Sequence, residues 1–162
     1  MVDVEIGRGR AARQGVDLRD IAIVPSRRTR DVDEVSTAWE IDAFRFEIPM
    51  VAHPSDATMS PRSVIELGRL GGLGVLNAEG LWARYDDPLP VYDEILAAAA
   101  ETDLATEVLQ RVYAEPVKPE LITARIQEVR AAGVTVAVRL SPQHTLTFAN
   151  AVLDAGVDLL II

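Results

Sequence analysis

The sequence predicts an α/β fold, specifically a (β/α)8 TIM barrel of which this chain covers roughly the first four strands. Short apolar runs of strand length alternate with longer segments whose apolar residues recur at helical spacing. A polar loop follows most of the apolar runs, and glycines close several of the helical segments. A helix between two such strands makes the strands parallel, and a complete barrel needs about 250 residues. The predicted strands begin at Ile48, Leu73, Val134 and Val157.

The first predicted strand–helix–strand unit spans residues 48–76. Residues 48–52 are apolar, bounded by polar residues and too few for a helix, so they predict a buried strand. Ser60 is a favourable N-cap and Pro61 suits the first helical position, which places the helix start there. Gly71-Gly72 provides its C-terminal cap, and residues 73–76 form the next strand.

Polar residues follow each of these two strands and are the candidate binding residues. Ligands of parallel sheets bind beyond the carboxyl ends of the strands, which predicts substrate or cofactor contacts at His53, Ser55 and Asp56, and at Asn77 with neighbouring Glu79. The imidazole of His53 could contact substrate, carry a proton or bond loop backbone. The carboxylate of Asp56 could orient a ligand hydroxyl or accept N–H groups of its own turn.

The remaining elements follow in order. The pattern predicts a hairpin that leads into the barrel, a loop with two prolines, two short helices with Asp93 and Asp103 as caps, and then two further helix–strand pairs. The corresponding segments are 38–41 and 44–46 for the hairpin, 78–89 for the loop, 93–100 and 103–112 for the short helices, 119–131 and 134–140 for the first pair, and 148–155 and 157–162 for the second.

The region before the barrel contains two basic clusters and one short apolar run. Arg8, Arg10 and Arg13 lie in an arm, residues 1–14, and Arg27, Arg28 and Arg30 lie in a loop; each cluster is either a phosphate contact or solvated surface. Residues 21–24 predict a short strand. The predicted division is 1–46, an N-terminal arm and hairpin, and 47–162, the first half of the barrel with a helical connection at about 82–118.

Composition excludes several classes of function. The net charge of −9 argues against nucleic acid as a partner, because phosphate binding needs a basic face. No apolar run approaches the roughly 20 residues of a membrane span, so we expect a cytoplasmic protein without membrane contact. The sequence has no cysteine, which excludes a thiolate nucleophile within it. Because the chain ends on an apolar strand, we expect it to be the N-terminal half of a longer protein.

Three other side chains, His144, Trp82 and Tyr85, are candidates for a functional role. His144 has no carboxylate partner at a motif spacing, and with two histidines in the chain no metal site is predicted, so we expect an exposed side chain. Trp82 and Tyr85 lie in a loop and are expected to pack against the core.

Three segments resemble the IMP dehydrogenase and GMP reductase family. Residues 48–57, IPMVAHPSDA, are similar to the pattern of that family's first barrel strand, residues 71–74, GGLG, to its second strand, and residues 18–26, LRDIAIVPS, to a segment upstream. The order and spacing also agree. His53 and Ser55 stand where the family usually has Ser and Met that touch the nucleotide.

The resemblance implies a purine nucleotide oxidoreductase that converts IMP to XMP with NAD, or a GMP reductase that uses NADPH. It places the catalytic cysteine, the phosphate site and a possible monovalent cation site beyond Ile162, so the 162 residues alone are expected to be inactive. It also implies a homo-oligomer, a tetramer, without the family's regulatory pair of nucleotide-sensing modules.

Two alternatives remain open. Flavin barrels of the nitronate-oxidising type are similar at the Ile48-Pro49-Met50 strand and the following Gly-Gly-Leu-Gly turn. A non-catalytic barrel that binds a nucleotide is the other, motivated by His53 and Ser55 at the usual contact positions.

Overall fold

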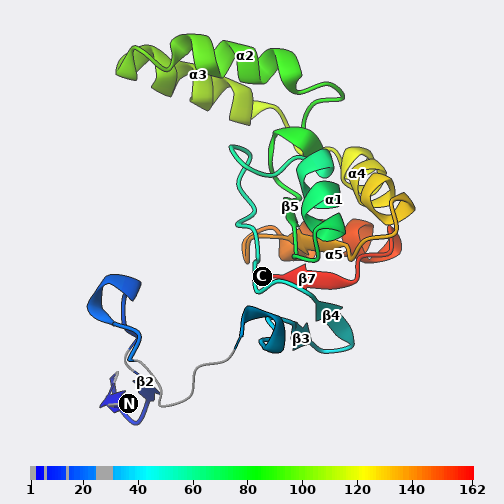
Figure 1. The fold of residues 1–162 in the computed structure, drawn as a ribbon. Coiled ribbons are helices and arrows are strands. Elements are labelled where there is room, and N and C mark those ends of the chain that lie inside the picture. The colour runs from blue at the N-terminus through cyan, green and yellow to red at the C-terminus, as the bar shows by residue number, and fades with distance from the viewer. Residues whose placement is uncertain (1–2, 6, 14, 25–30) are drawn as a thin grey trace. The chain divides into compact units, whose positions relative to one another are not determined.

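The computed structural model describes residues 3–5, 7–13, 15–24 and 31–162 and divides into two compact units, Met1–Val35 and Ser36–Ile162. Each unit is described by itself. Figure 1 shows the elements of both. The predicted basic cluster of Arg27, Arg28 and Arg30 lies outside the described residues.

The first unit contains a small antiparallel hairpin and two single turns of 3-10 helix. Gly7 and Gly9 adopt positive φ angles of 67° and 71° in the turn of the hairpin, a conformation that glycine enters without strain. The described residues of the turn are exposed, as expected for a solvated arm. The elements are β1 (Asp3–Glu5), β2 (Ala11–Arg13), η1 (Leu18–Asp20) and η2 (Val32–Glu34).

The predicted strand at residues 21–24 is wrong. This segment has no regular structure, and Ile23 is 98% exposed. A strand needs a partner for its backbone groups, and within the described residues the segment has none, so apolar composition alone does not make it a strand.

The second unit is a mixed α/β structure around a parallel sheet of order β5-β6-β7. Val51 extends the sheet by an isolated parallel bridge to Leu73. The strands are β5 (Val75–Asn77), β6 (Ala137–Arg139) and β7 (Leu159–Ile161), and the antiparallel hairpin is β3 (Trp39–Ile41) with β4 (Phe44–Phe46). The helical elements are α1 (Pro61–Arg69), η3 (Leu81–Ala83), α2 (Leu89–Ala98), α3 (Thr102–Ala114), α4 (Pro119–Ala131) and α5 (Thr145–Asp154).

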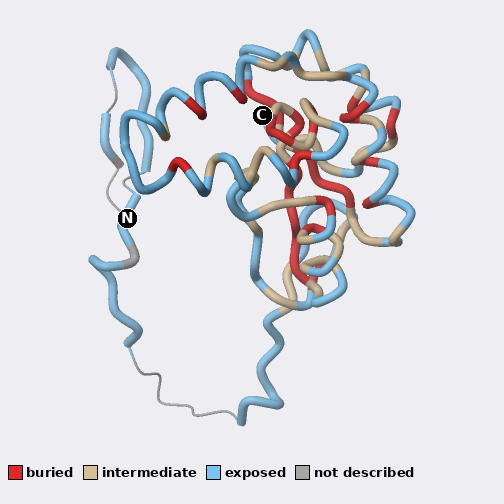
Figure 2. The backbone as a smooth tube through the Cα atoms, turned by 90° about the horizontal axis from the view of Figure 1, so that it is seen from above, coloured by how far each residue is buried: buried red, intermediate tan, exposed pale blue. Residues whose placement is uncertain are grey.

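The two faces of this sheet are covered differently (Figure 1). Because side chains alternate along a strand, Val75, Ala137 and Leu159 share one face, where they pack with Phe46 of the β3–β4 hairpin. The intervening side chains face the helices. They form the larger core with α1, α4 and α5, which includes Val64, Leu76, Ile126, Val129, Val136, Val138, Leu140 and Val152. Figure 2 shows the buried residues gathered along these strands and helices.

Helices α1 and α4 begin where the sequence predicts because their first residues carry local signals, whereas α5 spans Thr145–Asp154 and begins before the predicted 148. The Ser60 hydroxyl accepts the Ser63 N–H at 3.1 Å, so α1 starts at Pro61 as expected. Helix α4 has the predicted bounds, and Gly133 follows it with a φ of 73°.

Other boundaries were wrong. Helix α2 begins at Leu89, not at Asp93, because Pro90 suits the first turn and the Asp87 carboxylate accepts the Leu89 N–H at 3.1 Å. Helix α3 begins at Thr102 and ends at Ala114, so Asp103 is not its cap. The predicted loop at 78–89 contains η3, whose Leu81 is buried.

The first predicted strand, residues 48–52, is reduced to the single bridge at Val51. Met50 and Val51 are 54% and 53% exposed, so this segment is not buried as predicted. Among the described residues its backbone pairs on one side, with Leu73, which lies two residues before β5: the Leu73 N–H donates to the Met50 carbonyl, and the Ala52 N–H donates to the Leu73 carbonyl. A segment at the sheet edge with one neighbour is covered less than an inner strand.

None of the helices in the described ranges combines the length and the apolar composition that crossing a bilayer requires.

The contact between α1 and β5 yields a prediction. A Cβ added at Gly74 would lie 2.7 Å from the Cα of Val64, a backbone atom that cannot rotate away. We expect Gly74→Ala to destabilise the full-length protein by roughly 1–3 kcal/mol through overpacking. Gly15→Ala is the control, because an added Cβ meets nothing within 4 Å there. Thermal unfolding measures the stability of both variants. Equal melting temperatures for Gly74→Ala and Gly15→Ala would contradict the packing of α1 on β5.

Candidate site at the carboxyl edge of the sheet

Glu79 joins the loops that follow β5 and β6. Its carboxylate accepts the backbone N–H of Ser141, the Ser141 hydroxyl at 3.0 Å and the Nδ1 of His144 at 2.8 Å. The Glu79 side chain is only 12% exposed, whereas that of His144 is 55% exposed. The cluster of Glu79, Ser141 and His144, called here the Glu79 cluster, therefore has a largely buried acceptor and an exposed imidazole.

The pKa of Glu79 reflects two opposing effects. Burial raises it, because a carboxylate loses solvation. The hydrogen bonds from the Ser141 N–H, from His144 and from the Ser141 hydroxyl lower it, and together they outweigh burial, so the pKa of Glu79 lies below its ordinary value. Glu79 is therefore ionised at neutral pH.

The Glu79 cluster is not a nucleophilic triad. The Ser141 hydroxyl lies 3.2 Å from Nδ1 of His144, the same nitrogen that contacts Glu79, so the imidazole does not bridge the two. An ionised carboxylate can only accept, so a neutral His144 ring carries its proton on Nδ1. Its Nε2 is then a hydrogen-bond acceptor, and no described residue donates to it.

Asn77 ends β5 beside this cluster. Its side-chain oxygen accepts the Glu79 N–H at 3.1 Å, which fixes the turn and leaves the amide NH2 group as a donor. Arg139 is the β6 residue in register with Asn77 and shares its face of the sheet by strand alternation. This half-buried arginine has no carboxylate within salt-bridge distance among the described residues.

Asp56 is engaged by contacts within the protein. One carboxylate oxygen accepts the Leu81 N–H at 3.0 Å and the Tyr113 hydroxyl at 2.6 Å. The other is buried without a partner in the described residues and lies against Gly80, where an added Cβ would approach it to 1.9 Å. The Asp56 carbonyl also accepts the Tyr92 hydroxyl at 2.8 Å.

These contacts tie the loop after the first strand to the α2–α3 helical pair. Burial, followed by the negative charge of Asp56, raises the pKa of Tyr92 to about 12. Burial, the hydrogen bond to Asp56 and the same charge raise the pKa of Tyr113. Both hydroxyls are therefore protonated donors at neutral pH. The predicted site residue Asp56 thus has a structural role, although its donors come from η3, α2 and α3, not from its own turn.

The other residues predicted in this loop are less constrained. The Ser55 hydroxyl accepts the Ala57 N–H at 3.2 Å. The His53 carbonyl accepts the Ser55 N–H at 2.8 Å, while its exposed imidazole has no hydrogen bond among the described residues. The structure therefore brings together Asn77 with the Glu79 cluster, and places His53 on a separate loop.

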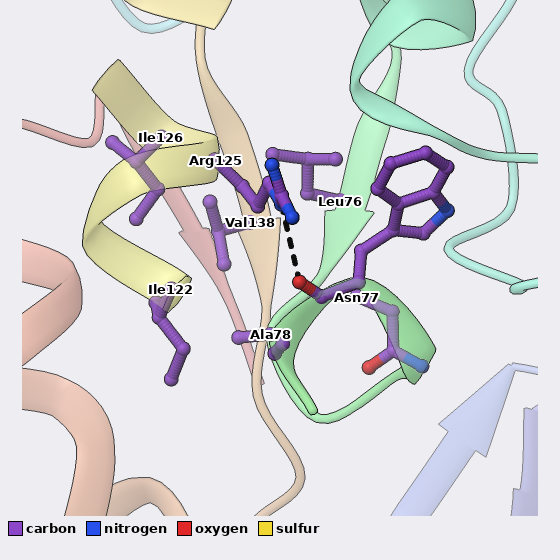
Figure 3. A pocket seen from close by; sticks show the side chains of 9 residues that line it. Leu76, Asn77, Ala78, Ile122, Arg125, Ile126 and Val138 are labelled. Carbon is purple, nitrogen blue, oxygen red and sulfur yellow. Dashed lines mark hydrogen bonds between the residues drawn. The ribbon is translucent and has the colours of Figure 1, made fainter. Parts of the chain in front are cut away.

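The second unit contains a small cavity and an open cleft that could be binding sites. Figure 3 shows the first, between β5, β6 and α4, where Arg125 donates to the Trp82 carbonyl at 3.2 Å. Its volume of about 10 Å³ is about what one water requires, so it is a packing defect. The second is an open cleft of about 340 Å³ at Asp56, and it is lined mainly by apolar side chains of η3, α2 and α3: Leu81, Tyr92, Ile95, Leu96, Leu109 and Tyr113.

The aromatic side chains of the η3 region pack as predicted. The Tyr85 hydroxyl donates to the Val112 carbonyl at 2.9 Å, and Arg125 lies 5.4 Å from the centre of the Trp82 ring.

In the described ranges no three histidine, cysteine or acidic side chains are grouped so as to hold a metal ion.

The hydrogen bond between His144 and the Glu79 carboxylate was not predicted from the sequence. The prediction of an exposed side chain is correct, but the carboxylate partner lies 65 residues away in the chain, at a separation that no motif covers. One signal was present: Glu79 and His144 each follow an apolar strand closely, and the carboxyl ends of parallel strands meet at one edge.

Comparison with known proteins gives strong similarity over nearly the whole chain. No family model matches. Uncharacterized oxidoreductases of Mycobacterium tuberculosis and Mycobacterium leprae are 53% and 54% identical over 162 residues, 98% of this chain. The chain spans 43% of the length of these curated relatives.

A solved structure is also similar. It is the crystal structure of an IMP dehydrogenase/GMP reductase-like protein from Corynebacterium glutamicum, which is 50% identical with a TM-score of 0.86. The similarity covers 99% of this chain and 44% of that protein. The α/β architecture and parallel sheet described above therefore recur in a protein of that description.

Glu79 gives a prediction of pH dependence. Its pKa is lowered in the folded state, so its contribution to stability is present above the ordinary value of 4.5 and is lost as the pH falls through the lowered pKa. We expect Glu79→Gln to destabilise the full-length protein by roughly 1–3 kcal/mol at pH 7, with a smaller difference from wild type under acid conditions. Glu66→Gln is the control, since Glu66 forms an exposed ion pair. Unfolding across pH measures this; a pH-independent difference would contradict it.

Asp56 and Tyr113 give a second prediction. Tyr113→Phe removes one donor to Asp56, and Asp56→Ala removes the acceptor. Because both variants break the same contact, we expect their effects on unfolding free energy to be non-additive by at least about 0.5 kcal/mol. Amide exchange in α2 and α3 should rise in both. Additive effects with unchanged exchange would show that Asp56 does not hold the helical pair.

Proposed function

We propose that this chain forms the first part of a (β/α)8 barrel in a nicotinamide-linked purine nucleotide oxidoreductase, which oxidises IMP to XMP with NAD. The observation that carries the proposal is the similarity to the IMP dehydrogenase/GMP reductase-like protein, 50% identical at a TM-score of 0.86 over 99% of this chain. The curated relatives named as oxidoreductases support the same class.

The geometry of the carboxyl edge supports a ligand site there. Parallel α/β sheets bind ligands at this edge, and Asn77, Arg139 and His144 each keep a polar group that the described residues leave open. An amide donor, a guanidinium and an imidazole acceptor fit the hydroxyl, amide and phosphate groups of a nucleotide or nicotinamide dinucleotide.

The bound nicotinamide would supply the hydride acceptor. Within this chain the residues would bind and orient: the Asn77 amide donates, and His144 accepts at a ring position fixed by Glu79. Asp56 contributes indirectly, by fixing the loop in which His53 is exposed. The nucleophilic cysteine, a monovalent cation site and assembly into a homo-oligomer, a tetramer, belong to the proposal for the full-length protein.

A second candidate is a barrel that binds a purine nucleotide without turnover. One observation favours it: of the three contact residues predicted in the loop after the first strand, Asp56 and Ser55 have hydrogen-bonded side chains, and the His53 ring has no described hydrogen bond. Substrate contacts at this loop are correspondingly few.

Assays of the full-length protein test the proposal. We expect NADH formation with IMP plus NAD; NADPH consumption with GMP would instead indicate the GMP reductase direction. Calorimetric binding of IMP, XMP or GMP without turnover would support the non-catalytic candidate. Flavin absorbance in the purified protein would contradict nicotinamide chemistry and favour the flavin alternative. Absence of both binding and turnover would overturn all nucleotide functions.

A further inference from the structure

Resting on the proposed function, we propose that His144 is a direct ligand contact whose Nε2 accepts a hydrogen bond from a ribose hydroxyl of the bound nucleotide. Three observations lead to this inference: the fixed orientation of the His144 ring, the charge of Glu79 behind it, and the amide donor of Asn77, whose side-chain oxygen accepts the Glu79 N–H.

The orientation of the ring follows from its contacts. Nδ1 is held 2.8 Å from the Glu79 carboxylate and 3.2 Å from the Ser141 hydroxyl. With that nitrogen engaged, the acceptor nitrogen Nε2 lies on the opposite side of the ring, and the side chain is 55% exposed. The Glu79 side chain is only 12% exposed, and burying a carboxylate costs free energy. A histidine that only filled surface would not need such a group to orient its ring.

Charge selects the kind of ligand group. The ionised Glu79 behind the ring disfavours an anion on its exposed side. A phosphate oxygen is also an acceptor and cannot donate to Nε2. The complementary group is therefore a neutral donor, and Arg139, in register with Asn77, is the cation at this edge that suits phosphate.

The side-chain amide of Asn77 indicates that the ligand group donating to His144 is a hydroxyl. Asn77 and His144 both contact Glu79, one through its backbone N–H and the other through its carboxylate. Asn77 presents donors, and His144 presents an acceptor. A hydroxyl both accepts and donates, so the vicinal hydroxyls of a ribose match this combination, whereas an N–H group matches only the imidazole.

The test uses His144→Asn in the full-length protein. The asparagine amide can replace the Nδ1 donor to Glu79 but has no atom at the place of Nε2. Calorimetry with IMP and with NAD distinguishes the two sources of ribose. We expect about tenfold weaker binding of one of them, with an unchanged melting temperature. For that ligand, the matching deoxyribose analogue should bind wild type about as weakly, and the variant should not distinguish analogue from parent.

Gln143→Ala is the matched control, an exposed residue of the same loop with no described hydrogen bond, and its affinities should equal those of wild type. Wild-type affinities in His144→Asn for both IMP and NAD would overturn the inference and leave the proposed function intact. Binding that depends on His144 without turnover would support the inference and contradict the enzyme proposal. Failure of wild type to bind either ligand would overturn both.

Discussion

The carboxylate of Glu79 is the contact on which the geometry of the carboxyl edge depends. The register of β5 with β6 ends at Asn77 and Arg139, and the Ala78 N–H still donates to the Arg139 carbonyl at 3.1 Å. Three donors from the second loop converge on Glu79 in the first. Because the carboxylate is largely buried, each bond is stronger than it would be in water, and the positions of Ser141 and His144 follow from it.

Asp56 performs the equivalent task at the neighbouring loop, with the opposite consequence for ligands. Its donors are a backbone N–H and two tyrosine hydroxyls of the helical pair, counting the one that bonds its carbonyl. Asp56 fixes the loop that carries the exposed His53 imidazole, but it makes no hydrogen bond to that ring. Glu79, by contrast, is bonded directly to the His144 imidazole, whose second nitrogen has no hydrogen bond among the described residues.

The parts of the fold that were predicted correctly are those with local signals. Ser60, Pro61 and Gly133 fix the ends of α1 and α4 without reference to any distant residue. Residues 21–24 and 48–52 have equally apolar sequences, but whether they form strands depends on neighbours that sequence periodicity does not show. The Glu79 cluster was missed for the same reason, since its contacts join residues more than 60 positions apart.

The distribution of charge reconciles an acidic chain with the nucleotide ligand that we propose. A net charge of −9 repels phosphate at long range, yet binding is decided by the groups within a few ångströms. At the carboxyl edge the carboxylates of Asp56 and Glu79 accept hydrogen bonds within the protein: Asp56 from Leu81 and Tyr113, and Glu79 from Ser141 and His144. Arg139 remains as a cation without a carboxylate partner in the described residues. The groups at this edge that the described residues leave open to a ligand are therefore an amide, a guanidinium and an imidazole, although the protein around them is acidic.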